Sequence, residues 1–262
     1  MTRRHILFEC EGATLSGTID MDGGTAGSKA GLLIVTGGNE VRSGAWSGQA
    51  LLAARIAAAG FPVLRFDQRG KGDSDGPPGD FQTNGPDIAA ALAAFRAECP
   101  ALARVVAMGN CDGASALMLS GGAGCDALVL SNPWTIEDEA AAPPPEALRG
   151  HYARRLADPA ALLRLLRGGV NLRALFASLL GALRPAPPPT GLAVDMASGL
   201  ARFPGDVRLL VAERDRTGQA FLSAWDKNDP RIRICEGATH SFVEPDAREW
   251  LEAQVLEVLR EA

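Results

Sequence analysis

The sequence has little of what several classes of protein require. Lys and Arg number 26 against 31 Asp and Glu, for a net charge of −5, so no basic surface for nucleic acid or for an anionic membrane is predicted. No window approaches the roughly 20 apolar residues of a membrane span. The first apolar run, residues 6–8, is too short for the core of a signal peptide. We therefore expect a cytoplasmic protein that binds no nucleic acid and does not insert stably into membranes.

Cysteine is also sparse. The five cysteines are scattered, odd in number and without a C-x-x-C pair, which excludes a disulfide framework and a cysteine-based zinc site. The glycine-rich loop at residues 69–76 lacks both the Gly-Lys-Ser/Thr of a Walker motif and a G-x-G-x-x-G. We expect neither a metal nor an organic cofactor.

Apolar runs alternate with helix-prone segments along most of the chain. With 262 residues, of which 47% are hydrophobic, the chain can bury a full core as one large domain. Strands alternating with helices predict a mostly parallel sheet flanked by helices, and the first two strands predict a hairpin at its edge. The strands are expected at residues 6–9, 14–21, 32–36, 63–67, 105–108, 127–130, 207–212 and 232–235.

The alternation stops at Pro133 and resumes near residue 204. A segment this long between strands is typical of a functional insertion. Its paired leucines are too apolar for the alternative, a disordered linker. We predict a helical cap at 134–203, inserted between two parts of the core at 1–133 and 204–262.

The most informative stretch is residues 109–113, which read Gly-Asn-Cys-Asp-Gly between a predicted strand and a predicted helix. A G-x-C-x-G pattern at this junction matches the elbow where α/β-hydrolases usually carry G-x-S-x-G. Cys111 is then a candidate nucleophile at a helix N-terminus, which favours its thiolate. The alternative is a buried packing cysteine.

A cysteine nucleophile needs a base, and only three histidines are available. His5 lies in the first predicted strand and His151 in the predicted cap. His240 directly follows the last predicted strand, where the carboxyl ends of parallel strands place catalytic groups. We predict that His240 is the base; the alternative is a surface histidine.

The acid that orients the base is expected after the preceding strand, in the order nucleophile, acid, histidine. Asp215 and Glu213 both lie there, and we prefer Asp215 because it stands further into the loop. Glu137 and Asp138, after the strand before that, are the fallback. The alternative for Asp215 and Glu213 is that both are solvated loop residues.

Two backbone N–H groups are expected to form an oxyanion hole. One belongs to Asp112, after the nucleophile, and the other to Asn39 or Gly38, although this Gly-Gly-Asn segment can also be an ordinary turn. Arg42 and Arg69 lie on loops at the same edge. Either can bind an anionic group of the substrate, or be simply exposed to solvent.

The loop at residues 67–76 resembles the D-x-R-G-x-G-x-S loop of the α/β-hydrolase superfamily, and with the elbow, the acid and the histidine the resemblance spans the chain. Residues 109–116, 132–134, 168–172 and 217–221 are similar to the first of two hydrolase families associated with the exosortase A system. That resemblance implies bacteria that make exopolysaccharide, but names no substrate. A cysteine replaces the usual serine, as in this closer family.

These features predict a hydrolase that acts on a small-molecule ester or thioester through a Cys111–His240–Asp215 triad and an acyl-cysteine intermediate. With an alcohol or amine in place of water, the same intermediate makes an acyltransferase. A ligand-binding member of the fold without catalysis is the third hypothesis. The leucines of the predicted cap suggest an apolar acyl group, and the sequence favours no oligomeric state.

Overall fold

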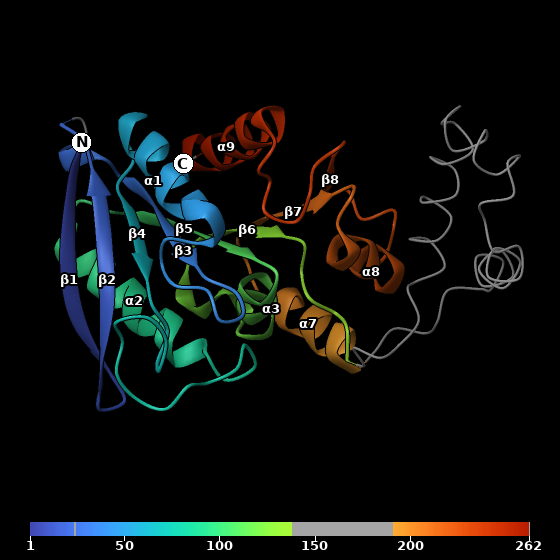
Figure 1. The fold of residues 1–262 in the computed structure, drawn as a ribbon, viewed down its shortest axis with the longest axis horizontal. Helices are drawn as coiled ribbons and strands as arrows, with labels where there is room; N and C mark the ends of the chain where they lie inside the picture. Colours follow the sequence, from blue (N-terminus) through green and yellow to red (C-terminus); the bar gives the residue numbers. More distant parts are fainter. Residues whose placement is uncertain (24, 138–190, 262) are drawn as a thin grey trace, which may run out of the picture.

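A single sheet organises the molecule (Figure 1). In the computed structural model, which describes residues 1–23, 25–137 and 191–261, eight strands form this sheet in the order β1-β2-β4-β3-β5-β6-β7-β8. They are β1 (Thr2–Cys10), β2 (Ala13–Met21), β3 (Ala30–Val35), β4 (Val63–Phe66), β5 (Arg104–Asn110), β6 (Ala127–Ser131), β7 (Asp206–Ala212) and β8 (Ile232–Cys235).

The pairing confirms a mostly parallel sheet with an antiparallel hairpin at its edge. β1 pairs antiparallel with β2, and β2 with β4, whereas every pair from β4 to β8 is parallel. Leu33 of β3 faces Ala107 of β5, and both are fully buried. Because helices cover both faces of the parallel strands, their sequences read as continuous apolar runs instead of alternating ones.

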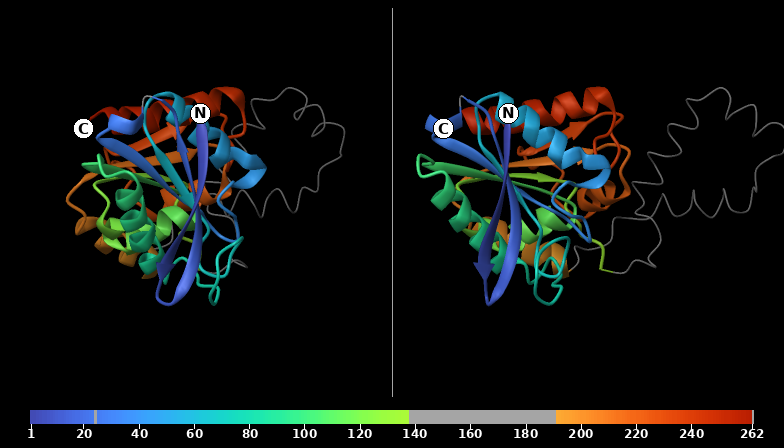
Figure 2. Two further views of the ribbon diagram at one scale, coloured as in Figure 1. Left: turned by 90° about the vertical axis from the view of Figure 1, so that its left-hand side faces the viewer. Right: turned by 60° about the vertical axis from the view of Figure 1, so that its left-hand side comes forward.

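Helices lie on both faces of the sheet, as Figure 2 shows. One face packs against α1 and α9 through residues such as Ile34 and Met108. The opposite face, which includes Leu33 and Val35, packs against α2, α3, α7 and α8. The helices are α1 (Gly48–Ala58), α2 (Gly85–Glu98), α3 (Asp112–Leu119), α7 (Gly191–Ala201), α8 (Arg216–Ala224) and α9 (Pro245–Arg260), with short 3₁₀ turns at Thr25–Gly27, Ala45–Ser47 and Gly121–Gly124.

The predicted cap falls largely on residues 138–190, which lie outside the described residues. The last part of that predicted insertion forms α7, which packs in the same layer as α3. Gly199 allows this close approach, because a Cβ there would lie 2.1 Å from the carbonyl oxygen of Met118. Residues 191–201 therefore contribute to the packed core, although the sequence pattern placed them with the cap.

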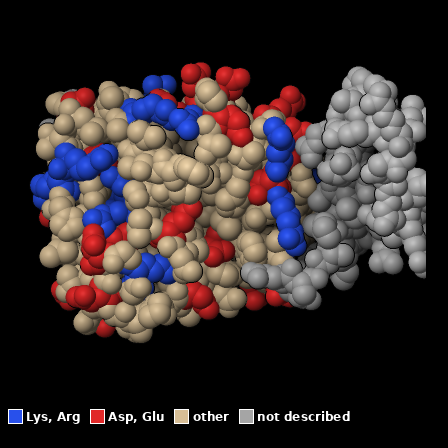
Figure 3. Space-filling view, viewed as in Figure 1, with Lys and Arg blue, Asp and Glu red and all other residues tan. Residues whose placement is uncertain are grey.

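The surface mixes both signs of charge. Acidic and basic side chains are interspersed over the face seen in Figure 3, in line with the small net charge of −5. Among the described residues, no helix combines the length and the apolar character needed to cross a membrane. The parallel strands all end at one edge of the sheet, and the candidate catalytic residues follow them there.

Candidate active site

Cys111 occupies a strained turn between β5 and α3. Its backbone has φ 55° and ψ −124°, a region that non-glycine residues rarely adopt and that marks functional sites. A Cβ on Gly109 would lie 2.4 Å from the carbonyl carbon of Gly113, and one on Gly113 would lie 2.5 Å from the carbonyl oxygen of Val35. The two glycines of the motif are therefore required by the close packing of this turn, which holds the thiol at the sheet edge.

His240 lies in the turn after β8 and contacts the acid that sequence reasoning preferred. Its Nδ1 is 2.9 Å from Oδ2 of Asp215, a side chain that is only about 7% exposed. The same Oδ2 accepts a hydrogen bond from the N–H of Gly218 at 2.9 Å, which caps the start of α8. Asp215 is thus fixed by its own helix and holds the tautomer and orientation of the imidazole.

The electrostatic environment favours the charged form of His240. Hydrogen bonding to Asp215 and to Cys111 raises the pKa of His240 to about 10, against the opposing effect of burial. A histidine in this state carries its proton between the carboxylate and the thiol.

Two asparagines hold the histidine turn against the nucleophile turn. Nδ2 of Asn110 lies 3.4 Å from both Nε2 and the carbonyl oxygen of His240. Buried Asn132 donates to the same carbonyl at 3.1 Å and to Oδ1 of Asn110 at 3.2 Å, and accepts from the N–H of Ala212 at 2.8 Å. Reasoning from the sequence gave neither residue a role. The signal for Asn132 is its position, a polar amide directly after the buried strand β6.

The side chain of Asp112 links Cys111 to the N–H of Gly38, one of the predicted oxyanion-hole donors. The N–H of Gly38 donates to Oδ2 of Asp112 at 3.1 Å, and the Cys111 thiol donates to Oδ1 at 3.8 Å. The Gly38 loop lies this close because Gly37 has no side chain: a Cβ there would be 2.6 Å from the carbonyl oxygen of Asn110. Of the two predicted loop donors, both exposed, it is the N–H of Gly38 that contacts the turn of Cys111.

Lys71 also contacts the loop that contains Gly38. Its Nζ donates to the carbonyl oxygen of Gly38 at 2.5 Å and to Oε1 of Gln68 at 2.8 Å. Burial lowers the pKa of Lys71 and raises that of Asp112, and each charge partly offsets the effect of burial on the other. Reasoning from the sequence gave Lys71 no role.

The two arginines that were predicted to bind the substrate form ion pairs within the protein. Arg42 pairs with Asp67 and Asp73, and Arg69 pairs with Glu11 and Asp87, so both guanidinium groups bind carboxylates of the protein itself.

The alternative acids also have partners of their own. Glu213 accepts from the N–H of Gly237 at 2.8 Å, and Glu137 from that of Leu192 at 2.6 Å. Asp138 lies outside the described residues. Within the part of the chain that is described, no group of three or more His, Cys, Asp or Glu side chains could hold a metal ion.

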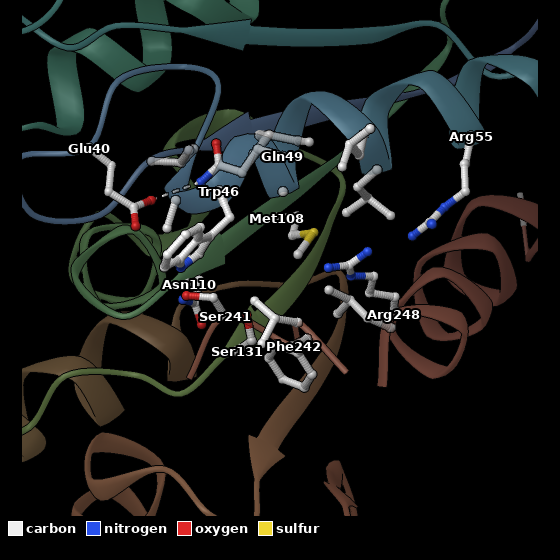
Figure 4. A pocket seen from close by; sticks show the side chains of 18 residues that line it. Glu40, Trp46, Gln49, Arg55, Met108, Asn110, Ser131, Ser241, Phe242 and Arg248 are labelled. Carbon is white, nitrogen blue, oxygen red and sulfur yellow. Dashed lines mark hydrogen bonds between the residues drawn. The ribbon is translucent and has the colours of Figure 1, made fainter. Parts of the chain in front are cut away.

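A pocket lies between the sheet and the helices α1 and α9, next to Asn110 and Ser241. Figure 4 shows Glu40 and Gln49 at one end, Met108 in the middle, and Arg55 and Arg248 at the other end. Its lining also includes Asn110 and Ser241, the sequence neighbours of the nucleophile and the histidine, together with Trp46, Leu52, Ser131, Phe242 and Leu251. The pocket therefore reaches the sequence neighbours of Cys111 and His240.

Comparisons with known proteins agree with the fold. The model of the alpha/beta hydrolase family matches residues 32–254. Among solved structures, the α/β hydrolase GrgF from Penicillium sp. sh18 superposes with a TM-score of 0.67 at 18% identity, covering 100% of this chain and 99% of that one. The esterase Pf2001 from Pyrococcus furiosus has a TM-score of 0.61 at 17% identity, covering 99% and 90%.

A serine hydrolase without a lid from Xanthomonas campestris, XC6422, also has a TM-score of 0.61, at 13% identity, and covers 99% of this chain and 96% of that one. These likenesses confirm the predicted fold. No curated protein sequence matches the chain significantly.

Proposed function

The chain belongs to the alpha/beta hydrolase family, and we propose that it hydrolyses a small-molecule ester or thioester through an acyl-cysteine intermediate. The observation that carries this proposal is the contact series from Asp215 to His240 to Cys111 at the carboxyl edge of the sheet. Its order along the chain, nucleophile before acid before histidine, is that of the family.

In the first step, the sulfur of Cys111 attacks the carbonyl carbon of the substrate and a C–S bond forms. The carbonyl oxygen becomes an oxyanion, which the N–H groups of Asp112 and Gly38 stabilise. His240 then passes its proton to the leaving alcohol or thiol as the C–O or C–S bond of the substrate breaks. Asp215 stabilises the charge of the imidazolium throughout.

The carbonyl oxygen can reach Gly38 only if the carboxylate of Asp112 leaves. The N–H of Gly38 now donates to that carboxylate, and one N–H cannot serve two acceptors well. The displaced carboxylate remains near Lys71, whose charge already acts on it. Binding of the substrate therefore competes with a contact inside the protein.

In the second step, His240 takes a proton from water, and the resulting hydroxide oxygen attacks the thioester. The second tetrahedral intermediate collapses to the acid, and the thiol of Cys111 recovers its proton from His240. The acyl portion of the substrate and the link to exopolysaccharide that the family resemblance implies both remain predictions.

Differential alkylation of the five thiols tests the proposal. Near neutral pH, iodoacetamide should modify Cys111 much faster than the other four cysteines, because only a thiolate reacts quickly. Burial raises the pKa of Cys10 to about 11 and that of Cys125 to about 12, so these two serve as internal controls. Replacing His240 with alanine should slow the alkylation of Cys111 to the rate of the other cysteines. Five equally slow thiols would contradict the proposal and leave a non-catalytic binding role.

A further inference from the structure

We propose that the pocket beside the triad binds an alcohol that bears an anionic group, and that this alcohol, in place of water, accepts the acyl group from Cys111. The inference rests on the proposed acyl-cysteine intermediate and names the acceptor that follows it. Four features of the pocket carry it: its position, the polar atoms at one end, its apolar walls, and the two arginines at the other end (Figure 4).

The pocket reaches residues that contact or adjoin the proposed base. Asn110 and Ser241 line it, and Nδ2 of Asn110 lies 3.4 Å from Nε2 of His240. Nε2 is the atom that must remove a proton from the acceptor during deacylation. A hydroxyl that replaces the amide of Asn110 at this nitrogen would therefore be placed for attack on the thioester.

One polar atom at this end of the pocket lacks a hydrogen-bond donor. Oε1 of Gln49 is buried and has no partner among the described residues. Nε2 of the same amide faces Oε2 of Glu40 at 3.4 Å, so exchanging the amide atoms would set two oxygens against each other. Burial raises the pKa of Glu40, an effect that the nearby charge of His240 opposes. A ligand with O–H groups would supply the missing donor.

These acceptors argue against a hydrocarbon acyl chain as the occupant. An alkyl chain would bury Glu40 and Gln49 further without offering either one a donor, which is costly for polar groups. Water alone would satisfy them, but the rest of the pocket does not suit water. Its walls are formed by Met108, Leu52 and Phe242, so an apolar body is expected beyond the hydroxyl.

The far end of the pocket is basic. Arg55, on α1, and Arg248, on α9, extend their guanidinium groups toward one another (Figure 4). Arg55 pairs with Glu252 at 2.7 Å, which leaves one positive charge in excess among these three groups. A carboxylate or phosphate on the ligand would lie between the two guanidinium groups and bind both.

The transfer step needs no reactant besides the acyl-enzyme and the alcohol. Nε2 of His240 takes the hydroxyl proton while the hydroxyl oxygen forms a bond to the thioester carbon. The tetrahedral oxyanion is held by the N–H groups of Gly38 and Asp112. The C–S bond then breaks, the proton passes from His240 to the sulfur of Cys111, and an ester of the acceptor leaves.

The inference is tested by measuring how much of the acyl-enzyme is hydrolysed and how much transfers its acyl group to an alcohol. With p-nitrophenyl butyrate as donor, release of p-nitrophenol reports acylation, while mass spectrometry counts butyrate against butyryl ester. We expect the ester to dominate with 6-hydroxyhexanoate, and the ratio of ester to acid to be about tenfold lower with 1-hexanol, which lacks the charge for the arginines. Release of p-nitrophenol with butyrate as the only product would overturn the inference and leave the proposed hydrolase intact.

Variants separate the pocket from the triad. Arg248→Ala should remove the preference for 6-hydroxyhexanoate over 1-hexanol, whereas Arg260→Ala, an exposed arginine at the end of the same helix, should keep it. Gln49→Ala should lower the ester-to-acid ratio for both alcohols. An unchanged ratio in both pocket variants would contradict the assignment of the site.

Binding can be measured without any chemistry. Cys111→Ala protein should bind 6-hydroxyhexanoate in a calorimetric titration, and the additional Arg248→Ala substitution should weaken that binding about tenfold. No detectable binding would overturn the pocket assignment, and this conclusion would not depend on whether Cys111 forms an acyl intermediate in the wild type. Absence of p-nitrophenol release from wild type would instead reject the proposed function, and the acceptor role of the pocket with it.

Discussion

The two sides of Cys111 are prepared differently for catalysis. On one side, His240 is already oriented, because Asp215 holds Nδ1 at 2.9 Å and two asparagines hold its turn. On the other side, the N–H of Gly38 is engaged by the carboxylate of Asp112 at 3.1 Å. In the proposed mechanism the base is therefore preorganised, whereas the substrate must displace the carboxylate of Asp112 from half of the oxyanion hole. Activation of the thiol and stabilisation of the transition state are thus separable by mutation.

The largest loss of activity is expected when His240 is removed. His240→Ala removes the group that activates the thiol and protonates the leaving group, so kcat/KM for p-nitrophenyl butyrate should fall on the order of 10⁴-fold. Steady-state kinetics at pH 7 measures this, and circular dichroism checks that the variant folds. A folded variant with a loss below tenfold would show that His240 is not the base.

Removing only the orienting charge should cost less. In Asp215→Asn the amide cannot stabilise the imidazolium and favours the wrong tautomer, so kcat should fall about 10²- to 10³-fold. Glu213→Gln is the matched control, because this carboxylate accepts from Gly237 and not from His240. Equal losses in the two variants would mean that the acid has been assigned wrongly.

Removing the carboxylate of Asp112 should have the opposite effect and raise activity. Asp112→Ala keeps the N–H of residue 112 but frees the N–H of Gly38, so kcat/KM should rise about tenfold, since a hydrogen bond to a charged group is worth about 1.5–3 kcal/mol. Asp112→Asn, whose neutral amide is a weaker acceptor, should lie between wild type and alanine. A fall in kcat/KM in both variants would show that the carboxylate assists catalysis.

The remaining prediction concerns stability and not activity. The pKa of His240 is raised from 6.5 to about 10 in the folded protein, so between these values the folded state binds more protons than the unfolded state. The stabilisation is complete below pH 6.5 and is lost as the pH rises toward 10. Urea unfolding should show that wild type loses more stability over this range than His240→Gln. Parallel pH curves would indicate that the charged pair does not form.

The elements that depend on local pattern could be predicted from the sequence. The parallel strands are apolar runs, and because their carboxyl ends meet at one edge, the position of Cys111, Asp215 and His240 follows from strand order. Gly38 was a candidate on the same grounds. The pattern of leucines and prolines assigned residues 191–201 to a cap, whereas these residues pack beside α3, which only the tertiary structure reveals.

Contacts between distant loops could not be predicted. The side chain of Asp112 reaches a glycine 74 positions away, and Lys71 contacts that same glycine from a third loop. Arg42 and Arg69 are arginines on loops of the expected edge, but their carboxylate partners come from segments that only the fold brings near. The pocket likewise joins α1, β5 and α9, which are far apart in the chain.

The most direct test of the central claim is the intact mass of the protein during turnover. After rapid acid quenching of a reaction with p-nitrophenyl butyrate, wild type should carry one butyryl group, and peptide mapping should place it on Cys111. The Cys111→Ala protein should carry none. An adduct on another residue, or turnover by Cys111→Ala at the wild-type rate, would contradict the account.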